Sequence, residues 1–447
     1  MFWLEHPERR LRFEFTDRSL DLRTGRVTLE WRFCDGQESL ALVERFEFPE
    51  IVAPTQERRD AIEAALDLLH WVAGISYWKM ACRGQVTYAA RSPDAFQARA
   101  LTSIYRSGLA EMAWRNKLGE RYWPDFPARL DTPVGVCDGA ASLGLRRRAL
   151  VPMGGGKDSL VALERVRRAG YRPETVQVGS AGLIGRVADR AGTRHRRIGR
   201  SLAPQLAHLN AGGVLNGHVP ITAINSCALV LAALLWDFDT VVFANERSAD
   251  TPTLIAPDGR PVNHQFAKSL EFECLLDDWI KRSIASDLKV FSILRRDREL
   301  SVCREFAGLE QYHDVFSSCN RNFHLDGPQT RRWCLRCPKC LFVFLALAPF
   351  VPVASLQRIF GADLLQRADL VESFAELLEL DGHRPFECVG EAGEARAAIR
   401  LLADDPHWKH HSVVSELDRR LEAVEGSDPA TWLEPGGPHR IPPGFLA

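Results

Sequence analysis

The stretch Ala149-Leu-Val-Pro-Met-Gly-Gly-Gly-Lys-Asp-Ser159 joins a short apolar run to three glycines and a polar turn. The apolar residues 149–153 predict a buried strand, and the residues after Ser159 open a helical pattern that ends near Gly170. A strand, a glycine turn and a helix start present backbone N–H groups to an anion. Glycine suits such a turn because a Cβ would keep phosphate oxygens away from the amides. The stretch therefore predicts a phosphate-binding loop in an α/β fold.

The spacing of the polar residues decides which kind of phosphate loop this is. A Walker A loop places its lysine directly before the hydroxyl residue, and here Asp158 separates Lys157 from Ser159. A G-x-G-x-x-G dinucleotide fingerprint also fails. The remaining pattern resembles the pyrophosphate loop (PP-loop) S-G-G-x-D-S of the ATP-pyrophosphatase superfamily, with Gly154 in place of the first serine. The alternative is an ordinary glycine-rich turn between a strand and a helix.

The composition is that of an ordinary globular protein with two or three folding units. The chain has 447 residues, a formal net charge of −1 and eleven cysteines. The near-zero charge gives no overall attraction to nucleic acid. The apolar run 341–356 contains two prolines and predicts a buried helix, not a membrane span. With no signal-peptide core at the N-terminus, we expect a cytoplasmic protein without membrane or nucleic-acid partners.

Three regions follow from the pattern along the chain. Residues 1–145 predict an N-terminal α+β domain, because three alternating runs precede two helical ones, at 11–15, 27–33, 42–48, 56–78 and 103–118. A linker is expected at 131–144, which is rich in Gly, Pro and Asp. Residues 146–350 would form the ATP-binding domain around the glycine loop. Residues 351–447 predict a helical C-terminal region.

The central region alternates between strands and helices. Strands are predicted at 149–153, 174–178, 194–198 and 240–244, and a long apolar helix at 221–236. This rhythm predicts an α/β fold with a doubly wound parallel sheet. Ligands of such sheets lie beyond the carboxyl ends of the strands. The segments that follow those ends are 154–159, Gly179-Ser180 and 245–248.

Four cysteines form a C-x14-C-x2-C-x2-C pattern, and they are Cys319, Cys334, Cys337 and Cys340. Closely spaced thiolates can meet one tetrahedral metal ion, which a more distant cysteine then completes. The spacing predicts a structural zinc site that staples residues 316–350. An iron–sulfur cluster and a pair of redox thiols are the alternatives.

Three polar segments carry further candidate groups. Residues 216–223, with His218, form either a polar lip at the nucleotide or a capped helix start. Segments 245–248 and 263–269 are dense in hydrogen-bonding groups. In them Arg247 and Lys268 could bind a multiply anionic substrate, and Glu246 could hold Mg²⁺ or move a proton. A solvated polar loop is the alternative.

Taken together, the glycine loop, the three polar segments and the cysteine cluster resemble the UDP-N-acetylmuramoyl-L-alanyl-L-glutamate epimerases (MurL) of peptidoglycan synthesis. The resemblance covers most of residues 10–350. It implies a PP-loop fold and the ATP-dependent conversion of the terminal L-glutamate of UDP-MurNAc-L-Ala-L-Glu to D-glutamate through an acyl-adenylate, giving AMP and pyrophosphate. The alternative is an adenylate-forming ligase or synthase similar to 7-cyano-7-deazaguanine synthase, acting on a small carboxylate.

The resemblance also implies roles for individual residues. ATP would meet Gly154, Gly155, Gly156, Lys157, Ser159 and Ser180, while Asp158 would hold Mg²⁺. Arg247, Lys268 and Arg295 would meet the diphosphate and the glutamate carboxylates. The epimerising base is left open among Glu246, His264, His218 and Lys268. The implied partner is a nucleotide-sugar dipeptide, and the oligomeric state is left open.

Overall fold

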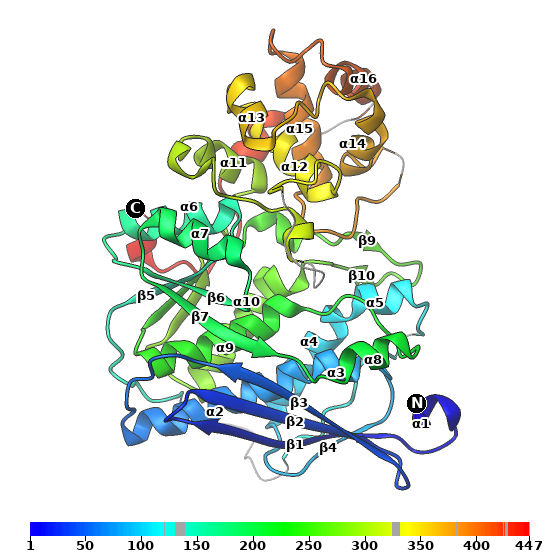
Figure 1. Cartoon of the computed structure of the whole chain (residues 1–447), viewed down its shortest axis with the longest axis vertical. Coiled ribbons are helices and arrows are strands. Elements are labelled where there is room, and N and C mark those ends of the chain that lie inside the picture. Colours follow the sequence, from blue (N-terminus) through cyan, green and yellow to red (C-terminus); the bar gives the residue numbers. More distant parts are fainter. Residues whose placement is uncertain are drawn as a thin grey trace.

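The computed structural model describes most of the chain (Figure 1). The described residues are 1–119, 121–129, 139–323, 331–380, 382–422, 424 and 428–446. Residues 131–138 of the predicted linker lie outside them. In the described part no helix is long and apolar enough to cross a membrane.

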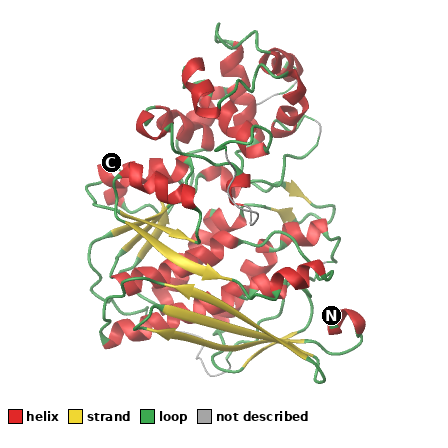
Figure 2. Ribbon diagram, viewed as in Figure 1, coloured by secondary structure: helices red, strands yellow, loops and turns green. Residues whose placement is uncertain are grey.

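A nine-stranded mixed sheet runs through the lower part of the molecule (Figure 2). Its order is β11-β8-β5-β6-β7-β3-β2-β1-β4. The strands are β1 (Arg12–Asp21), β2 (Arg26–Cys34), β3 (Ser39–Glu47), β4 (Gln85–Tyr88), β5 (Ala149–Pro152), β6 (Glu174–Val178), β7 (His195–Ser201), β8 (Thr240–Phe243) and β11 (Lys289–Ser292). A small separate ribbon pairs β9 (Leu254–Ile255) with β10 (Pro261–Val262).

Five neighbouring strands, β11, β8, β5, β6 and β7, are all parallel. The chain adds β6 and β7 on one side of β5, then crosses to add β8 and β11 on the other side. The order therefore reverses between β5 and β8, which is where α/β sheets place their ligands. The prediction of an α/β fold is confirmed. A PP-loop fold type stays a prediction.

The N-terminal strands continue this sheet instead of forming one of their own. β1, β2 and β3 are antiparallel neighbours, as the alternating sequence predicts, and β3 pairs with β7 through Arg45–Glu47. β1 has a register shift between Phe15 and Asp17, and β4 pairs with it only along Arg12–Phe15. The predicted boundary at residue 145 is thus crossed by one continuous sheet.

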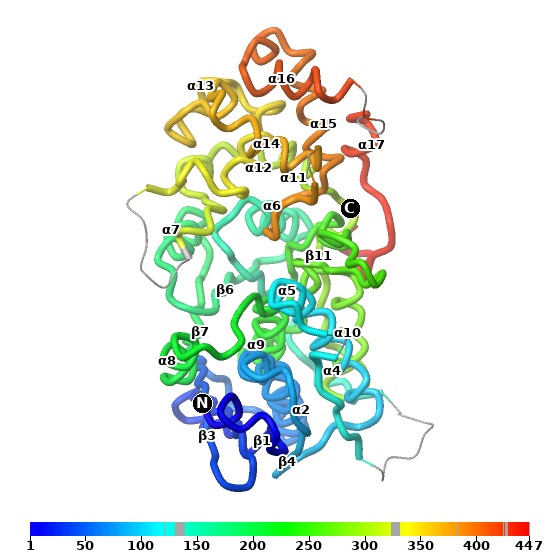
Figure 3. Tube along the Cα trace, turned by 90° about the vertical axis from the view of Figure 1, so that its right-hand side faces the viewer, coloured from blue at the N-terminus to red at the C-terminus, as the bar shows by residue number. Residues whose placement is uncertain are grey.

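Helices cover the sheet and form a separate C-terminal layer (Figure 3). The helices around the sheet are α1 (Phe2–Glu5), α2 (Gln56–Ala73), α3 (Ile75–Trp78), α4 (Ala95–Gly108), α5 (Ala110–Arg115), α6 (Lys157–Arg168), α7 (Gly182–Ala191), α8 (Leu206–Ala211), α9 (Ile221–Trp236) and α10 (Leu270–Ser283). The others are α11 (Glu299–Ala307), α12 (Pro338–Leu347), α13 (Val353–Phe360), α14 (Val371–Leu377), α15 (Ala392–Ala403), α16 (Ser412–Leu421) and α17 (Pro429–Leu433).

Two contacts join elements that are far apart in the sequence. On α2, Arg58 donates to Asp237 at the end of α9 over 2.8 Å, and both side chains are buried. At the other end of the chain, Phe445 stacks on Tyr171 and meets the edge of Phe291. The C-terminal tail therefore returns to the parallel strands after the helical layer. The described residues after 351 form the helices α13 to α17, and the domain bounds at 146–350 and 351–447 stay predictions.

Candidate active site

A cavity of about 380 Å³ opens at the carboxyl ends of the parallel strands, and we call it the loop cavity. It lies where the strand order reverses. Its polar lining comes from the glycine loop, β6, α9, the segment after β8, the 3₁₀ helix Phe266–Lys268 and the residues next to Cys319 and Cys340, which we call the cysteine-rich segment. These lining residues are Gly154, Gly156, Asp158, Ser159, Gln177, Thr222, Asn225, Asn245, Lys268, Ser318 and Lys339. The structure thus brings together the glycine loop and Lys268, which the sequence placed in separate motifs.

The glycine loop needs its glycines for different reasons. Gly155 has φ +80°, a conformation that favours glycine. At Gly156 a Cβ would come within 2.6 Å of Ser318 Oγ, so a side chain there requires Ser318 to move. At Gly154 a Cβ would meet nothing within 4 Å, since this position borders the loop cavity. The amide of Ser317 donates to Gly155 O over 2.9 Å and ties the loop to the cysteine-rich segment.

Lys157, the first residue of α6, is buried and held between two carboxylates. Its Nζ donates to Asp158 Oδ1 over 2.5 Å and forms an ion pair with Glu299 on α11. Burial opposes the charge, but the two carboxylates outweigh it and hold the pKa of Lys157 well above its usual value. Among the described residues, Asp158 lines the loop cavity and Lys157 does not. Lys157 therefore neutralises the carboxylate that faces the ligand space.

Glu246 belongs to a group of buried carboxylates behind the loop. Its Oε2 accepts the amide of Ala249 over 3.0 Å and caps the 3₁₀ helix Arg247–Asp250. Burial and the neighbouring charges of Glu299, Glu394 and Asp158 hold the pKa of Glu246 well above its usual value. This favours the protonated form, so Glu246 is a poor proton acceptor in this environment.

Cys388 is a site residue that the sequence reasoning missed. It is half-buried and lies in the loop before α15, where the Val389 carbonyl accepts from Gln265 Nε2 over 3.1 Å. The thiol interacts with Lys268 and His264 and feels the charge of Lys339. Burial opposes its ionisation, but these cations outweigh burial and hold the pKa of Cys388 well below its usual value. The thiolate form is therefore favoured beside Lys268 and Lys339, which line the loop cavity, whereas Cys388 itself is not among its lining residues.

Behind His264 lies a buried polar cluster. His264 Nδ1 is 2.5 Å from Glu111 Oε2, and the rings of His218 and His264 are 4.3 Å apart. Burial opposes the charge on His264, but Cys388 and Glu111 raise its pKa to about 9. Burial and the nearby His264 lower the pKa of His218 to about 4. A charged His264 thus bridges Glu111 and the Cys388 thiolate, beside a neutral His218.

Three other predicted residues lie away from the loop cavity. Ser180 is exposed beyond the end of β6. Arg247 packs near the C-terminal tail, where a Cβ at Gly437 would come within 3.3 Å of its Nε. Arg295 is fully buried and donates to the carbonyls of Glu246 over 3.0 Å and Lys268 over 2.7 Å. Arg295 therefore fixes the backbone of two polar segments and does not reach the ligand space.

The four predicted cysteines come together. The Sγ atoms of Cys319 and Cys337 are 4.0 Å apart, those of Cys334 and Cys340 3.7 Å, and those of Cys337 and Cys340 3.5 Å. Two thiolates on one tetrahedral zinc ion lie about 3.8 Å apart for a Zn–S bond of about 2.3 Å. The cluster could therefore hold a metal ion such as zinc. It lies next to Ser318 and Lys339, which line the loop cavity.

Comparison with known proteins gives consistent matches over most of the chain. Residues 5–293 match the model of the MurL N-terminal domain, and residues 315–431 match that of the MurL C-terminal domain. A protein of Xanthomonas oryzae pv. oryzae is 44% identical over 440 residues, which cover 96% of this chain and 95% of the relative. A Micromonospora protein is 39% identical over 97% of this chain and 96% of its own. Both are named UDP-N-acetyl-alpha-D-muramoyl-L-alanyl-L-glutamate epimerase.

Proposed function

Because the chain belongs to the MurL epimerase family, we propose that it converts the terminal L-glutamate of UDP-MurNAc-L-Ala-L-Glu to D-glutamate for peptidoglycan synthesis. We further propose that ATP activates the glutamate α-carboxylate in the loop cavity and that Cys388 then accepts the α-proton. The observation that carries this proposal is the position of Lys268. This residue lines the loop cavity, where the carboxylate would be activated, and it also interacts with the Cys388 thiol, which would take the proton. The two proposed steps would therefore take place on either side of Lys268.

The chemistry explains why an epimerase would need a nucleotide. Removing the proton beside a free carboxylate places a second negative charge next to the first. If a carboxylate oxygen bonds to the α-phosphorus of ATP, the bond to the β-phosphate breaks and pyrophosphate leaves. The acyl-adenylate has lost the carboxylate charge, and its carbonyl can accept the electron pair that the α-proton leaves behind. Water finally cleaves the acyl phosphate and releases AMP and the carboxylate.

The loop cavity fits the first step. The amides of Gly154–Gly156 and the start of α6 offer donors to pyrophosphate, as helix N-termini do for anions. Asp158 faces the cavity and is a suitable Mg²⁺ ligand, while Lys157 balances its charge. When bound, Mg²⁺ would neutralise phosphate charge. The cavity volume of about 380 Å³ is within the range of small-molecule sites.

Cys388 fits the second step. A thiolate is a competent proton acceptor near neutral pH, and the adjacent cations Lys268 and His264 keep it ionised. Lys268 is also placed to stabilise negative charge that develops on the acyl oxygen. The thiolate takes the α-proton and becomes a thiol, and a proton that comes from solvent water adds to the opposite face of the carbon and gives the D centre. Of the four bases left open by the sequence, His264 and Lys268 become partners of this thiolate.

The four-cysteine cluster completes the proposal as a structural zinc site. Ser318 and Lys339 are neighbours of metal ligands in the sequence and line the loop cavity. A closed four-thiolate site holds such a segment rigidly without taking part in the chemistry.

Incubation with ATP, Mg²⁺ and UDP-MurNAc-L-Ala-L-Glu in D₂O tests the proposal. We expect one AMP and one pyrophosphate per turnover, and a product that carries one deuterium at the glutamate α-carbon. Mass spectrometry measures the deuterium, and chiral analysis of the hydrolysed product identifies D-glutamate. AMP release without deuterium at that carbon would contradict the role in epimerisation. Epimerisation that proceeds without ATP would contradict the adenylate.

A further inference from the structure

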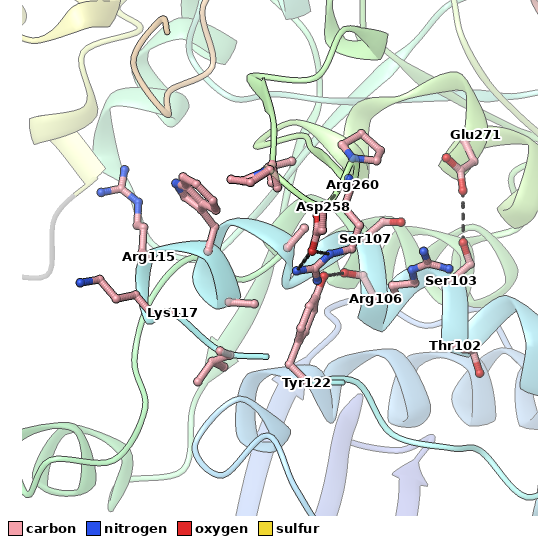
Figure 4. A pocket seen from close by; sticks show the side chains of 18 of the residues that line it. Thr102, Ser103, Arg106, Ser107, Arg115, Lys117, Tyr122, Asp258, Arg260 and Glu271 are labelled. Atoms are coloured by element: carbon pink, nitrogen blue, oxygen red, sulfur yellow. Dashed lines mark hydrogen bonds and ion pairs between the residues drawn. The ribbon is translucent and has the colours of Figure 1, made fainter. Parts of the chain in front are cut away.

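A second cavity, of about 930 Å³, lies between α4, α5 and the β9–β10 ribbon (Figure 4). We call it the basic cavity. Its charged lining among the described residues consists of five cations and two carboxylates: Arg99, Arg106, Arg115, Lys117, Arg260, Asp258 and Glu271. In Figure 4, Arg115 and Lys117 lie at one end and Ser103 and Glu271 at the other. The excess of positive charge suits an anionic ligand.

The two carboxylates do not neutralise all five cations. Asp258 pairs with Arg260 over 2.6 Å, and Glu271 accepts from Ser103 Oγ over 3.1 Å. Within the described part of the chain, Arg99, Arg106 and Lys117 form no ion pair, and all three are exposed to the cavity side of the protein surface. Three positive charges without counter-charges therefore line one open cavity. Diphosphate groups are recognised by such arginine and lysine side chains.

The remaining lining suits a nucleoside attached to the diphosphate. Trp114 lines the cavity and is 39% exposed, so that its aromatic face is open to a base, whereas Tyr122, which also lines the cavity, is buried. Thr102, Ser103 and Ser107 on α4 add hydroxyl groups that can bond a ribose or a pyrimidine edge. The volume is near the upper end for small-molecule sites and is larger than the loop cavity.

A chain of contacts leads from the basic cavity to Cys388. Arg115 Nε donates to Glu111 Oε1 over 2.7 Å, and Glu111 Oε2 is 2.5 Å from His264 Nδ1. His264 in turn interacts with the Cys388 thiol. Glu111 and His264 are thus the two side chains that link Arg115 to Cys388. The lactyl, alanyl and glutamyl units that separate the sugar from the reacting carbon span at most about 10 Å when extended.

We propose that the basic cavity binds the nucleoside diphosphate of the nucleotide-sugar substrate and that Arg106 and Lys117 hold its diphosphate. This inference rests on the proposed function, and it assigns a binding site to the nucleotide end of the substrate. The nucleoside diphosphate lies between α4 and the β9–β10 ribbon, the peptide passes Arg115, and the glutamate reaches the loop cavity. The two cavities then hold two different nucleotides, the substrate and ATP.

Titration calorimetry on the full chain without ATP tests this assignment. UDP-MurNAc, which lacks the dipeptide, is the probe, and UDP and uridine separate the diphosphate from the base. We expect UDP-MurNAc and UDP to bind, and uridine to bind at least tenfold more weakly than UDP. Arg106→Glu is expected to weaken UDP-MurNAc binding at least tenfold and to leave ATP binding unchanged.

The matched control is Arg121→Glu. Arg121 is exposed, pairs with Asp125 over 2.7 Å and does not line the basic cavity. This variant should bind UDP-MurNAc like the parent chain. Equal affinities of the Arg106→Glu and parent proteins, or no binding of UDP-MurNAc to the parent protein, would overturn the assignment. If UDP-MurNAc binds as expected but no deuterium enters the product, the proposed chemistry fails and the nucleotide site stands.

Discussion

At the scale of single residues, the proposed base is a thiol that no sequence motif marks. Cys388 lies beyond the cysteine cluster, in a loop whose composition is ordinary, and only the fold brings it to Lys268 and His264. The sequence did predict His264, His218 and Lys268 as candidates, because polar groups after parallel strands collect at binding sites. It could not predict that burial would protonate Glu246 or enclose Arg295. Those outcomes depend on packing between segments far apart in the chain.

Replacing Cys388 by serine separates the two proposed steps. A serine hydroxyl does not ionise near neutral pH, so Cys388→Ser should slow deuterium entry at the glutamate α-carbon about 10²- to 10⁴-fold. Pyrophosphate release from ATP should persist, since the loop cavity is unchanged. Product mass and pyrophosphate are measured in the same reaction. Cys34→Ser, at the end of β2, is the control and should keep both rates. Undiminished deuterium entry in Cys388→Ser would exclude the thiol as the base.

The pH dependence should report the pair of Cys388 and His264. The thiolate forms as pH rises through the lowered pKa of Cys388, and the charge on His264 is lost as pH rises through about 9. Epimerisation should therefore be high around neutral pH and fall above about pH 9. His264→Asn removes one cation, so the acid limb should move to higher pH by about one unit. An acid limb at the same pH in both proteins would contradict the pairing.

At the scale of elements, the glycine loop and the cysteine-rich segment form one structural unit. The sequence predicted both, because strand-turn-helix and cysteine spacing are local patterns. It predicted the strands 174–178 and 240–244 to within a residue, since apolar β-branched runs between turns are strong signals. The contact between the glycine loop and the cysteine-rich segment could not be predicted from local patterns, because the two segments are far apart in the chain. It joins Gly155 to Ser317 and places Gly156 against Ser318.

Gly156→Ala tests the packing of this unit. Gly156 has φ −90° and ψ 175°, which any residue adopts, so the cost comes from the contact of the new methyl with Ser318 Oγ. We expect a loss of about 1–3 kcal/mol in the free energy of unfolding, measured by urea denaturation. Ser318→Ala removes the crowding oxygen. The double variant should therefore be more stable than Gly156→Ala alone, and an unchanged loss in the double variant would rule out this contact as the cause.

At the scale of the whole molecule, one sheet carries both the N-terminal strands and the parallel strands of the site. The alternating sequence of the first fifty residues predicted three strands but not their partner. The pairing of β3 with β7 depends on residues about 150 positions apart, which no local pattern encodes. The division at residue 145 stays a prediction. The family matches instead meet between residues 293 and 315.

The buried ion pair of Arg58 on α2 and Asp237 at the end of α9 contributes to the stability of the packing between these helices. Arg58→Ala leaves a buried carboxylate with one fewer partner, so we expect a loss of about 3 kcal/mol in the free energy of unfolding. Thermal or urea unfolding followed by circular dichroism measures it. Arg367→Ala breaks an exposed pair with Asp369 and should cost less than about 0.5 kcal/mol. Equal losses of unfolding free energy in the two variants would show that the buried pair stabilises the fold no more than an exposed pair does.

The incomplete coverage of β1 by β4 bears on whether a strand of a second chain can pair with this edge of the sheet. Beyond Phe15, within the described chain, the outer side of β1 has no strand partner, and an open strand edge is a template for aggregation. The register shift after Phe15 distorts that edge, and the exposed Asp17 and Asp21 add charges along β1, whereas Arg18 pairs with Glu63 and Asp67 of α2. A strand from a second chain would have to bury those charges. The edge is therefore protected against sheet-to-sheet polymerisation by its own sequence.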